Sequence, residues 1–84
     1  LTISNEEGLH ARPAAKFVKL ANLFPCEIWV EKDDEEINGK SIMGLMMLAA
    51  SKGSVISVSA EGEEAETALE KLVELVDSGF EIDV

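Results

Sequence analysis

Four short stretches of the chain alternate apolar and polar residues, which is the pattern of a strand with one buried face. They are Leu1–Asn5, Cys26–Lys32, Glu35–Ile37 and Ser54–Ala60. In the second stretch, Cys26, Ile28 and Val30 share the side that is predicted to face the core. Because none of the four stretches is continuously apolar, the sheet is predicted to leave its other face in water.

Three further stretches repeat apolar residues every three or four positions, as amphipathic helices do. They run from Pro13 to about Leu23, from Ile42 to about Ala50, and from the turn at 61–64 to Gly79, with 80–84 as a tail. The predicted core stripe of the first helix is Ala14, Phe17, Val18 and Ala21. That of the last helix is Ala65, Leu69, Leu72 and Val76.

The order of these elements is β-α-β-β-α-β-α over 84 residues, a length that suits one domain with a modest core. Three amphipathic helices are predicted to cover the buried face of the sheet. The sequence therefore predicts an α/β fold, a two-layer open-faced sandwich that residues 1–84 form as a single domain.

The acidic run Lys32–Glu36 lies between two predicted strands and is typical of a hairpin turn. A calcium loop is the alternative for these carboxylates, but the run has neither the spacing nor the glycine of an EF-hand. We therefore expect a solvated turn and no metal site.

The second predicted helix is apolar on two faces. One stripe, predicted to face the core, is Ile42, Leu45, Met46 and Ala49. The other stripe is Met43, Met47 and Ala50. An outer helix in so small a domain cannot bury both, so the methionines are predicted to form an exposed patch of the kind that marks a partner site. The alternative is that Met43 and Met47 pack under the first helix or its loop.

The formal net charge of −10 argues against nucleic acid or an anionic membrane as a partner, because phosphates select basic surfaces. One cysteine cannot form an internal disulfide. No stretch approaches the ~18 apolar residues of a membrane span, and Leu1–Asn5 does not resemble a signal peptide. A small, acidic, cytoplasmic protein is expected.

The one histidine of the sequence, His10, lies in the stretch Gly8–Ala15, two residues before Arg12. Because Pro13 suits the first turn of a helix, His10 is predicted at or near the N-cap, close to the free N–H groups of Ala11 and Arg12. A helix N-terminus beside a guanidinium binds anions, and imidazole is a nucleophile. The stretch predicts phosphoryl chemistry on His10, with a surface or capping histidine as the alternative.

Other catalytic chemistry has few residues to use. His10 and Cys26 lie in different predicted elements and make a poor ligand set for a metal. Cys26 is also predicted on the inward face of a strand, where thiols are usually unreactive. Hydrolytic or redox catalysis is therefore not expected.

Ser41 directly precedes the second predicted helix, and serine is among the best N-cap residues. A phosphate on Ser41 would lie at the helix N-terminus beside Lys40 and would border the methionine patch. A regulatory modification of Ser41 is therefore compatible with its capping role.

Two motifs resemble the HPr family, the histidine-containing phosphocarrier proteins of the bacterial phosphoenolpyruvate-dependent phosphotransferase system. They are Gly8-Leu9-His10-Ala11-Arg12-Pro13-Ala14 and Lys40-Ser41-Ile42-Met43-Gly44-Leu45. The resemblance extends over essentially the whole chain. It implies a four-stranded, mainly antiparallel sheet and a monomeric phosphoryl carrier that is no enzyme and needs no cofactor.

The resemblance further implies that phosphorylated enzyme I transfers its phosphoryl group to Nδ1 of His10, which passes it to a histidine of a sugar-specific IIA domain. Arg12 would steady the phosphoryl group, and the amides of Ala11 and Arg12 would donate to it. The implied docking residues are Ile42, Met43, Met46 and Met47, with Lys16 and Lys19. Ser41 matches the serine that an HPr kinase/phosphorylase modifies, which hinders docking and in some organisms signals carbon catabolite repression through a transcriptional regulator.

Two departures from the family pattern concern the partners. The chain is unusually acidic, so docking is predicted to depend on a local basic ring, formed by Arg12, Lys16, Lys19, Lys40 and Lys52. The segments 45–50 and 78–81 are similar to the nitrogen-branch paralogue, which phosphorylates a regulatory IIA protein instead of importing sugar. A third hypothesis is a regulatory binding module that is recognised through phospho-Ser41 and does not need His10.

Overall fold

The computed structural model describes residues 1–3, 11–48 and 53–82. Within these ranges the chain forms three helices and three strands. They are α1 (Ala11–Ala21), β1 (Glu27–Lys32), β2 (Glu35–Asn38), α2 (Ile42–Met47), β3 (Ser57–Glu61) and α3 (Ala65–Asp77). α1 begins at Ala11, two residues before the predicted start at Pro13. It ends at Ala21, about two residues before the predicted end at Leu23.

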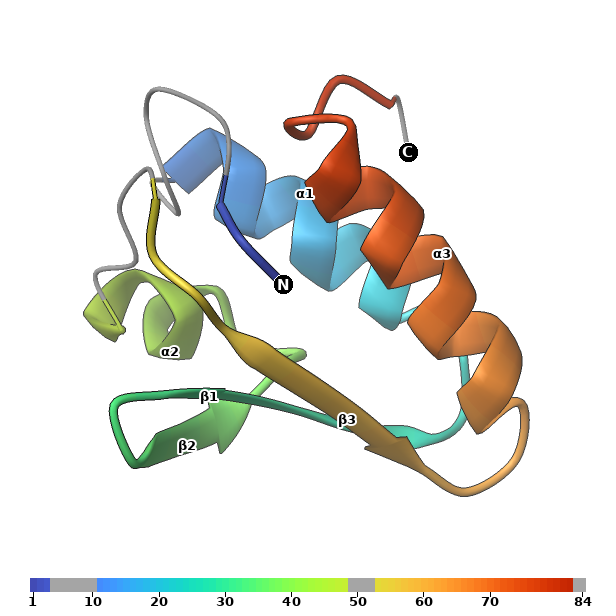
Figure 1. Cartoon of the computed structure of the whole chain (residues 1–84). Helices are drawn as coiled ribbons and strands as arrows, with labels where there is room; N and C mark the ends of the chain where they lie inside the picture. Colours follow the sequence, from blue (N-terminus) through green and yellow to red (C-terminus); the bar gives the residue numbers. More distant parts are fainter. Residues whose placement is uncertain (4–10, 49–52, 83–84) are drawn as a thin grey trace.

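The sheet has the strand order β2-β1-β3, and β1 is antiparallel to both of its neighbours. Val30, at the centre of β1, lies opposite Ile37 on one side and Val58 on the other. Figure 1 shows α1 and α3 on one face of the sheet, and α2 beside β2. The predicted two-layer arrangement and the antiparallel pairing are therefore present.

The prediction of a fourth strand at Leu1–Asn5 is wrong for residues 1–3, the part of this stretch that the structure describes. Residues 1–3 run antiparallel to the segment 53–56, with Ile3 N–H donating to the Ser54 carbonyl at 2.8 Å, but only one isolated bridge forms, between Thr2 and Val55. Apolar alternation reports burial, and Ile3 is indeed fully buried. It does not report how many residues pair, so the described residues form a three-stranded sheet rather than the predicted four-stranded one.

The hairpin between β1 and β2 confirms the predicted acidic turn. Lys32 pairs with Glu35, which leaves Asp33 and Asp34 as a two-residue loop. Both aspartates have positive φ, 51° and 67°. Two successive left-handed residues are the signature of the type I′ turn, which matches the twist of antiparallel strands.

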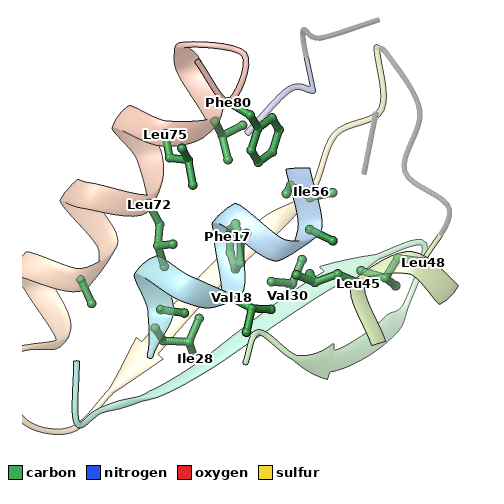
Figure 2. Close-up of a cluster of buried hydrophobic side chains, with 14 of the residues drawn as sticks. Phe17, Val18, Ile28, Val30, Leu45, Leu48, Ile56, Leu72, Leu75 and Phe80 are labelled. Atoms are coloured by element: carbon green, nitrogen blue, oxygen red, sulfur yellow. The ribbon is translucent and has the colours of Figure 1, made fainter. Parts of the chain in front are cut away.

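A single cluster of buried side chains joins the helices to the sheet (Figure 2). The predicted stripe of α1 is confirmed, since all four of its residues are buried. In α3 the buried residues are Ala68, Leu72, Leu75 and Val76. The predicted Ala65 and Leu69 are only half-buried, so α3 is rotated slightly from the predicted orientation.

The end of α3 differs from the predicted tail. Phe80 N–H donates to the Leu75 carbonyl at 2.9 Å and Gly79 N–H donates to the Val76 carbonyl at 3.0 Å. These two bonds, with Gly79 at φ 70°, form a Schellman cap, in which the residue after the glycine packs back on the helix. Phe80 is accordingly buried in the core beside Leu75 (Figure 2).

A tight connection from β2 to α2 sets the position of the second helix. The Asn38 side chain accepts a hydrogen bond from Lys40 N–H at 2.8 Å, and Gly39 N–H donates to the Ile28 carbonyl at 2.7 Å. A Cβ on Gly39 would lie 2.6 Å from Cγ2 of Ile28, so only glycine allows this approach. The predicted Asn-Gly turn therefore places Ser41 at the start of α2.

Candidate functional site

The N-terminal turn of α1 is exposed. Ala11 and Arg12 are its first two residues and both face solvent, whereas Pro13 is buried. The first amides of a helix have no partner within it, and Pro13 contributes no N–H. This exposed turn therefore contains helix-end amides that the helix itself does not bond, together with the exposed Arg12 side chain. His10 precedes Ala11 in the sequence, but it lies outside the described residues.

Ser41 is the N-cap of α2, as predicted. Its φ and ψ of −113° and 115° are non-helical, and its Oγ accepts a hydrogen bond from Gly44 N–H at 3.0 Å. A Cβ on Gly44 would lie 3.2 Å from that Oγ, so the glycine leaves room for the capping hydroxyl.

Four side chains of α2 form an exposed apolar area, which we call the methionine surface. It consists of Ile42, Met43, Met46 and Met47, which are 41%, 75%, 44% and 76% exposed. Only Leu45 and the following Leu48 are buried here. The prediction that Met43 and Met47 are exposed is confirmed. The predicted core positions of Ile42 and Met46 are wrong, because the inner face of this short helix is filled by the two leucines. The predicted Ala49 and Ala50 lie outside the described residues.

The methionine surface is held next to α1. The two helices are in contact, and in Figure 1 α2 lies at the end of the molecule where α1 begins. Lys40 also links the two helices, since its Nζ donates to the Phe24 carbonyl, just after α1, at 2.7 Å. The structure thus brings α1, which begins inside the first motif at Ala11, into contact with α2, which begins inside the second motif at Ile42.

The lysines of the predicted basic ring differ in exposure and in hydrogen bonding. Lys19 is exposed, while Lys16 and Lys40 are half-buried. Nζ of Lys16 donates to the Phe80 carbonyl at 2.8 Å, and Lys40 is bonded to Phe24 as described. Both lysines therefore bind a carbonyl that follows a helix. Lys52 lies outside the described residues.

The carbonyl groups of Phe24 and Phe80 were not predicted from the sequence as partners of these lysines. A signal was available for Phe80, because a glycine followed by an apolar residue at a helix end is the pattern of a Schellman cap. No comparable local signal marks the Phe24 carbonyl, whose lysine lies 16 residues away.

Cys26 is buried, as predicted, and lines a small pocket of about 120 Å³ together with Pro25 and Trp29. In the described ranges, no three His, Cys, Asp or Glu residues are grouped so that they could hold a metal ion. Likewise, none of the helices described is long and apolar enough to cross a membrane.

The comparisons with known proteins decide the family. The family model for the "PTS HPr component phosphorylation site" matches residues 1–78. The phosphocarrier protein HPr of Neisseria meningitidis serogroup A is 48% identical over 80 residues, which are 95% of this chain and 90% of that protein. The chain belongs to the HPr family. The HPr-like protein Crh of Bacillus subtilis is 52% identical over 69 residues, which are 82% of this chain and 81% of Crh.

Solved structures agree with this assignment. HPr from Thermoanaerobacter tengcongensis superposes with a TM-score of 0.94 and 50% identity, covering all of this chain and 94% of that one. The Crh dimer superposes with a TM-score of 0.75 and 45% identity, covering 98% of this chain and 94% of that one. The HPr-like α+β fold is therefore shown, and the predicted monomer stays a prediction.

HPr proteins are phosphocarriers and not catalytic enzymes, so the general role predicted from the sequence is confirmed. The chain is a phosphocarrier of the phosphoenolpyruvate-dependent phosphotransferase system (PTS). The similarity to Crh, described as a catabolite repression HPr, also connects the family with carbon catabolite regulation.

Proposed function

We propose that this chain accepts a phosphoryl group from phosphorylated enzyme I on Nδ1 of His10 and passes it to a IIA component of the PTS. One observation carries the proposal: the family's phosphorylation-site model covers the His10 stretch, and α1 begins directly after that residue. His10, Arg12 and Pro13 together favour a carrier over a regulatory module that does not need the histidine.

In the proposed transfer the lone pair of Nδ1 forms a bond to phosphorus. The bond between phosphorus and the donor breaks, and the donor atom keeps the electron pair. The first amides of α1, from Ala11 and Arg12, and the Arg12 guanidinium would offset the negative charge of the phosphoryl group. Such transfers need positioning and charge neutralisation more than additional catalytic groups, which suits so sparse a site.

We propose that the methionine surface is the area on which both PTS partners dock, with the exposed Lys19 of α1 beside it. Lys16, whose Nζ is bonded to the Phe80 carbonyl, is assigned no docking role here. Exposed, flexible apolar side chains suit a surface that must fit more than one partner. The chain's charge of −10 favours apolar contact here, with the local cations providing orientation.

Ser41 carries a second proposal, regulation by an HPr kinase/phosphorylase and a transcriptional regulator that recognises phospho-Ser41. Its Oγ is only part-buried and lies next to Ile42 and Met43 of the methionine surface. A phosphate would bring nearly two negative charges to that border and hinder apolar docking. The similarity to the Crh proteins supports this proposal.

Incubation of the chain with enzyme I and labelled phosphoenolpyruvate tests the carrier proposal. We expect a phosphate that is labile in acid and stable in base, as on a histidine, and no such label on a His10→Ala variant. A Ser41→Ala variant is the matched control and should be labelled normally. Acid-labile label on His10→Ala would refute the site.

The nitrogen-branch alternative shares the same chemistry and differs in the acceptor. Labelled protein should be offered separately to a sugar-specific IIA domain and to a regulatory IIA protein. Faster transfer to the regulatory protein would assign the chain to the nitrogen branch.

A further inference from the structure

Lys16 makes an unusual connection for a surface lysine. It lies in the middle of α1, half-buried, and its Nζ donates to the carbonyl of Phe80, 64 residues away, at 2.8 Å. Lys16 is also four residues after Arg12, so the two cations share one face of the helix, where like charges repel. The Phe80 carbonyl, in the cap that follows α3, binds the Lys16 ammonium in spite of that repulsion.

The acceptor itself is held firmly. Phe80 has a φ of +64°, a left-handed conformation that bulky side chains rarely adopt. Such a conformation persists only where the surroundings determine it. Here two cap bonds at the end of α3 and the burial of the aromatic ring fix it. The backbone that carries the acceptor carbonyl is therefore held by the α3 cap and by the buried ring.

The bond supplies something that the core contacts of α1 do not. Burial of Phe17 and Val18 holds α1 on the sheet, and the stabilisation that apolar burial provides is non-directional. A hydrogen bond is directional. Lys16 lies about one helical turn from Arg12, so a constraint on Lys16 also constrains the exposed N-terminal turn.

We propose that Lys16 is a positioning residue for phosphoryl transfer, which fastens α1 to the C-terminal cap of α3 and thereby fixes the turn that carries Ala11 and Arg12. This inference rests on the proposed function, since that turn is proposed to receive the phosphoryl group. It assigns Lys16 a role different from that of Lys19, which is exposed and suited to contact a partner directly.

The test is steady-state phosphoryl transfer from phosphorylated enzyme I to three variants with the same change of charge. Lys16→Met keeps the stem and removes the ammonium, Lys19→Met removes a proposed docking cation, and Lys71→Met removes an exposed cation of α3. Misplacement by 1 Å costs up to ~100-fold in rate, so we expect kcat of Lys16→Met to fall about tenfold with KM within about twofold. Lys19→Met should raise KM instead, and Lys71→Met should change neither.

A spectroscopic measurement accompanies the kinetics. The amide resonances of Ala11 and Arg12 should shift in Lys16→Met and stay in place in Lys71→Met. Lys16→Arg retains a donor and is expected to retain kcat, which keeps the proposal testable if Lys16→Met is too unstable to assay. A higher KM with unchanged kcat would make Lys16 a docking cation, and a lower melting temperature with unchanged kinetics would make it purely structural. Either result overturns the proposal.

Failure of this inference can be told apart from failure of the proposed function. If the unaltered chain accepts no phosphate from enzyme I, the proposed function itself is wrong. If the unaltered chain is phosphorylated and Lys16→Met behaves like Lys71→Met, only the positioning role is wrong.

Discussion

At the scale of single residues, the Ser41 hydroxyl combines a structural and a proposed regulatory role. Its Oγ accepts the Gly44 amide at 3.0 Å, so Ser41→Ala should leave that donor without its cap. We expect a loss of ~1 kcal/mol in the free energy of unfolding, the usual effect of removing an N-cap side chain. Urea unfolding measures it.

Ser41→Asp is the matched variant. A carboxylate can accept the same amide and suits the positive end of the helix, so stability should return to near that of the unaltered chain. Its charge borders the methionine surface, so phosphoryl transfer should be slower than in Ser41→Ala. Equal transfer rates in the two variants would contradict the proposal that charge at this border hinders docking.

The Ser41 cap and the Phe80 cap show what local sequence can predict. The hydroxyl of Ser41 meets an amide three residues away, and that contact forms wherever the helix begins. The burial of Phe80 depends instead on the space that α1 and α3 leave between them, and on Lys16, 64 residues away. The glycine before Phe80 indicates a helix cap, but the pattern of nearby residues contains no information on that space or on Lys16.

At the scale of elements, α2 has two faces with different roles. Leu45 and Leu48 anchor it, and the methionine surface faces solvent. Substituting both Met43 and Met47 by serine should change the free energy of unfolding by less than about 0.5 kcal/mol, as exposed sites do. If each methionine contributes about 1 kcal/mol to docking, KM for enzyme I and for the IIA partner should rise about 30-fold.

Leu45→Ala is the control for the opposite face. Because Leu45 is fully buried, its truncation should cost about 2–5 kcal/mol in unfolding free energy. Unfolding curves and transfer kinetics of both variants separate the two faces. A loss of stability in the double methionine variant, with normal KM, would place the methionines in the fold rather than in docking.

The same helix shows where periodicity fails. Its sequence is apolar nearly all round, so the spacing fits two stripes equally well and cannot say which one meets the core. The chosen stripe contained Leu45, which the fold does bury, but also Ile42 and Met46, which the fold leaves exposed while it buries Leu48. The orientation of such a helix is decided by the turn at Asn38–Gly39 and by contact with α1, which are tertiary features.

At the scale of the whole molecule, the family motifs and the alternating pattern predicted the layers and the antiparallel pairing. The number of strands was wrong, because pairing length depends on where the 53–56 segment leaves the sheet. The register also has a consequence that composition alone does not show. Two glutamates of β1 each lie directly opposite a glutamate of a neighbouring strand: Glu27 faces Glu61 of β3, and Glu31 faces Glu36 of β2.

These like-charge pairs should lower the free energy of unfolding of a protein that already carries a net charge of −10. Glu31→Lys converts one pair into an attractive pair, and we expect a gain of ~0.5–1 kcal/mol in unfolding free energy at low salt. Near 1 M salt, where the screening length is ~3 Å, most of the gain should vanish. Urea unfolding of each protein at both salt concentrations measures the difference.

Glu35→Lys is the control that separates the local pair from the total charge. It changes the net charge by the same amount, four residues along the same hairpin, but Glu35 lies opposite Lys32, so the variant creates a repulsive pair. If the cross-strand pair dominates, Glu31→Lys should be stabilised and Glu35→Lys should not. Equal stabilisation of both variants would show that self-repulsion of the whole molecule, rather than the sheet register, sets the electrostatic part of its stability.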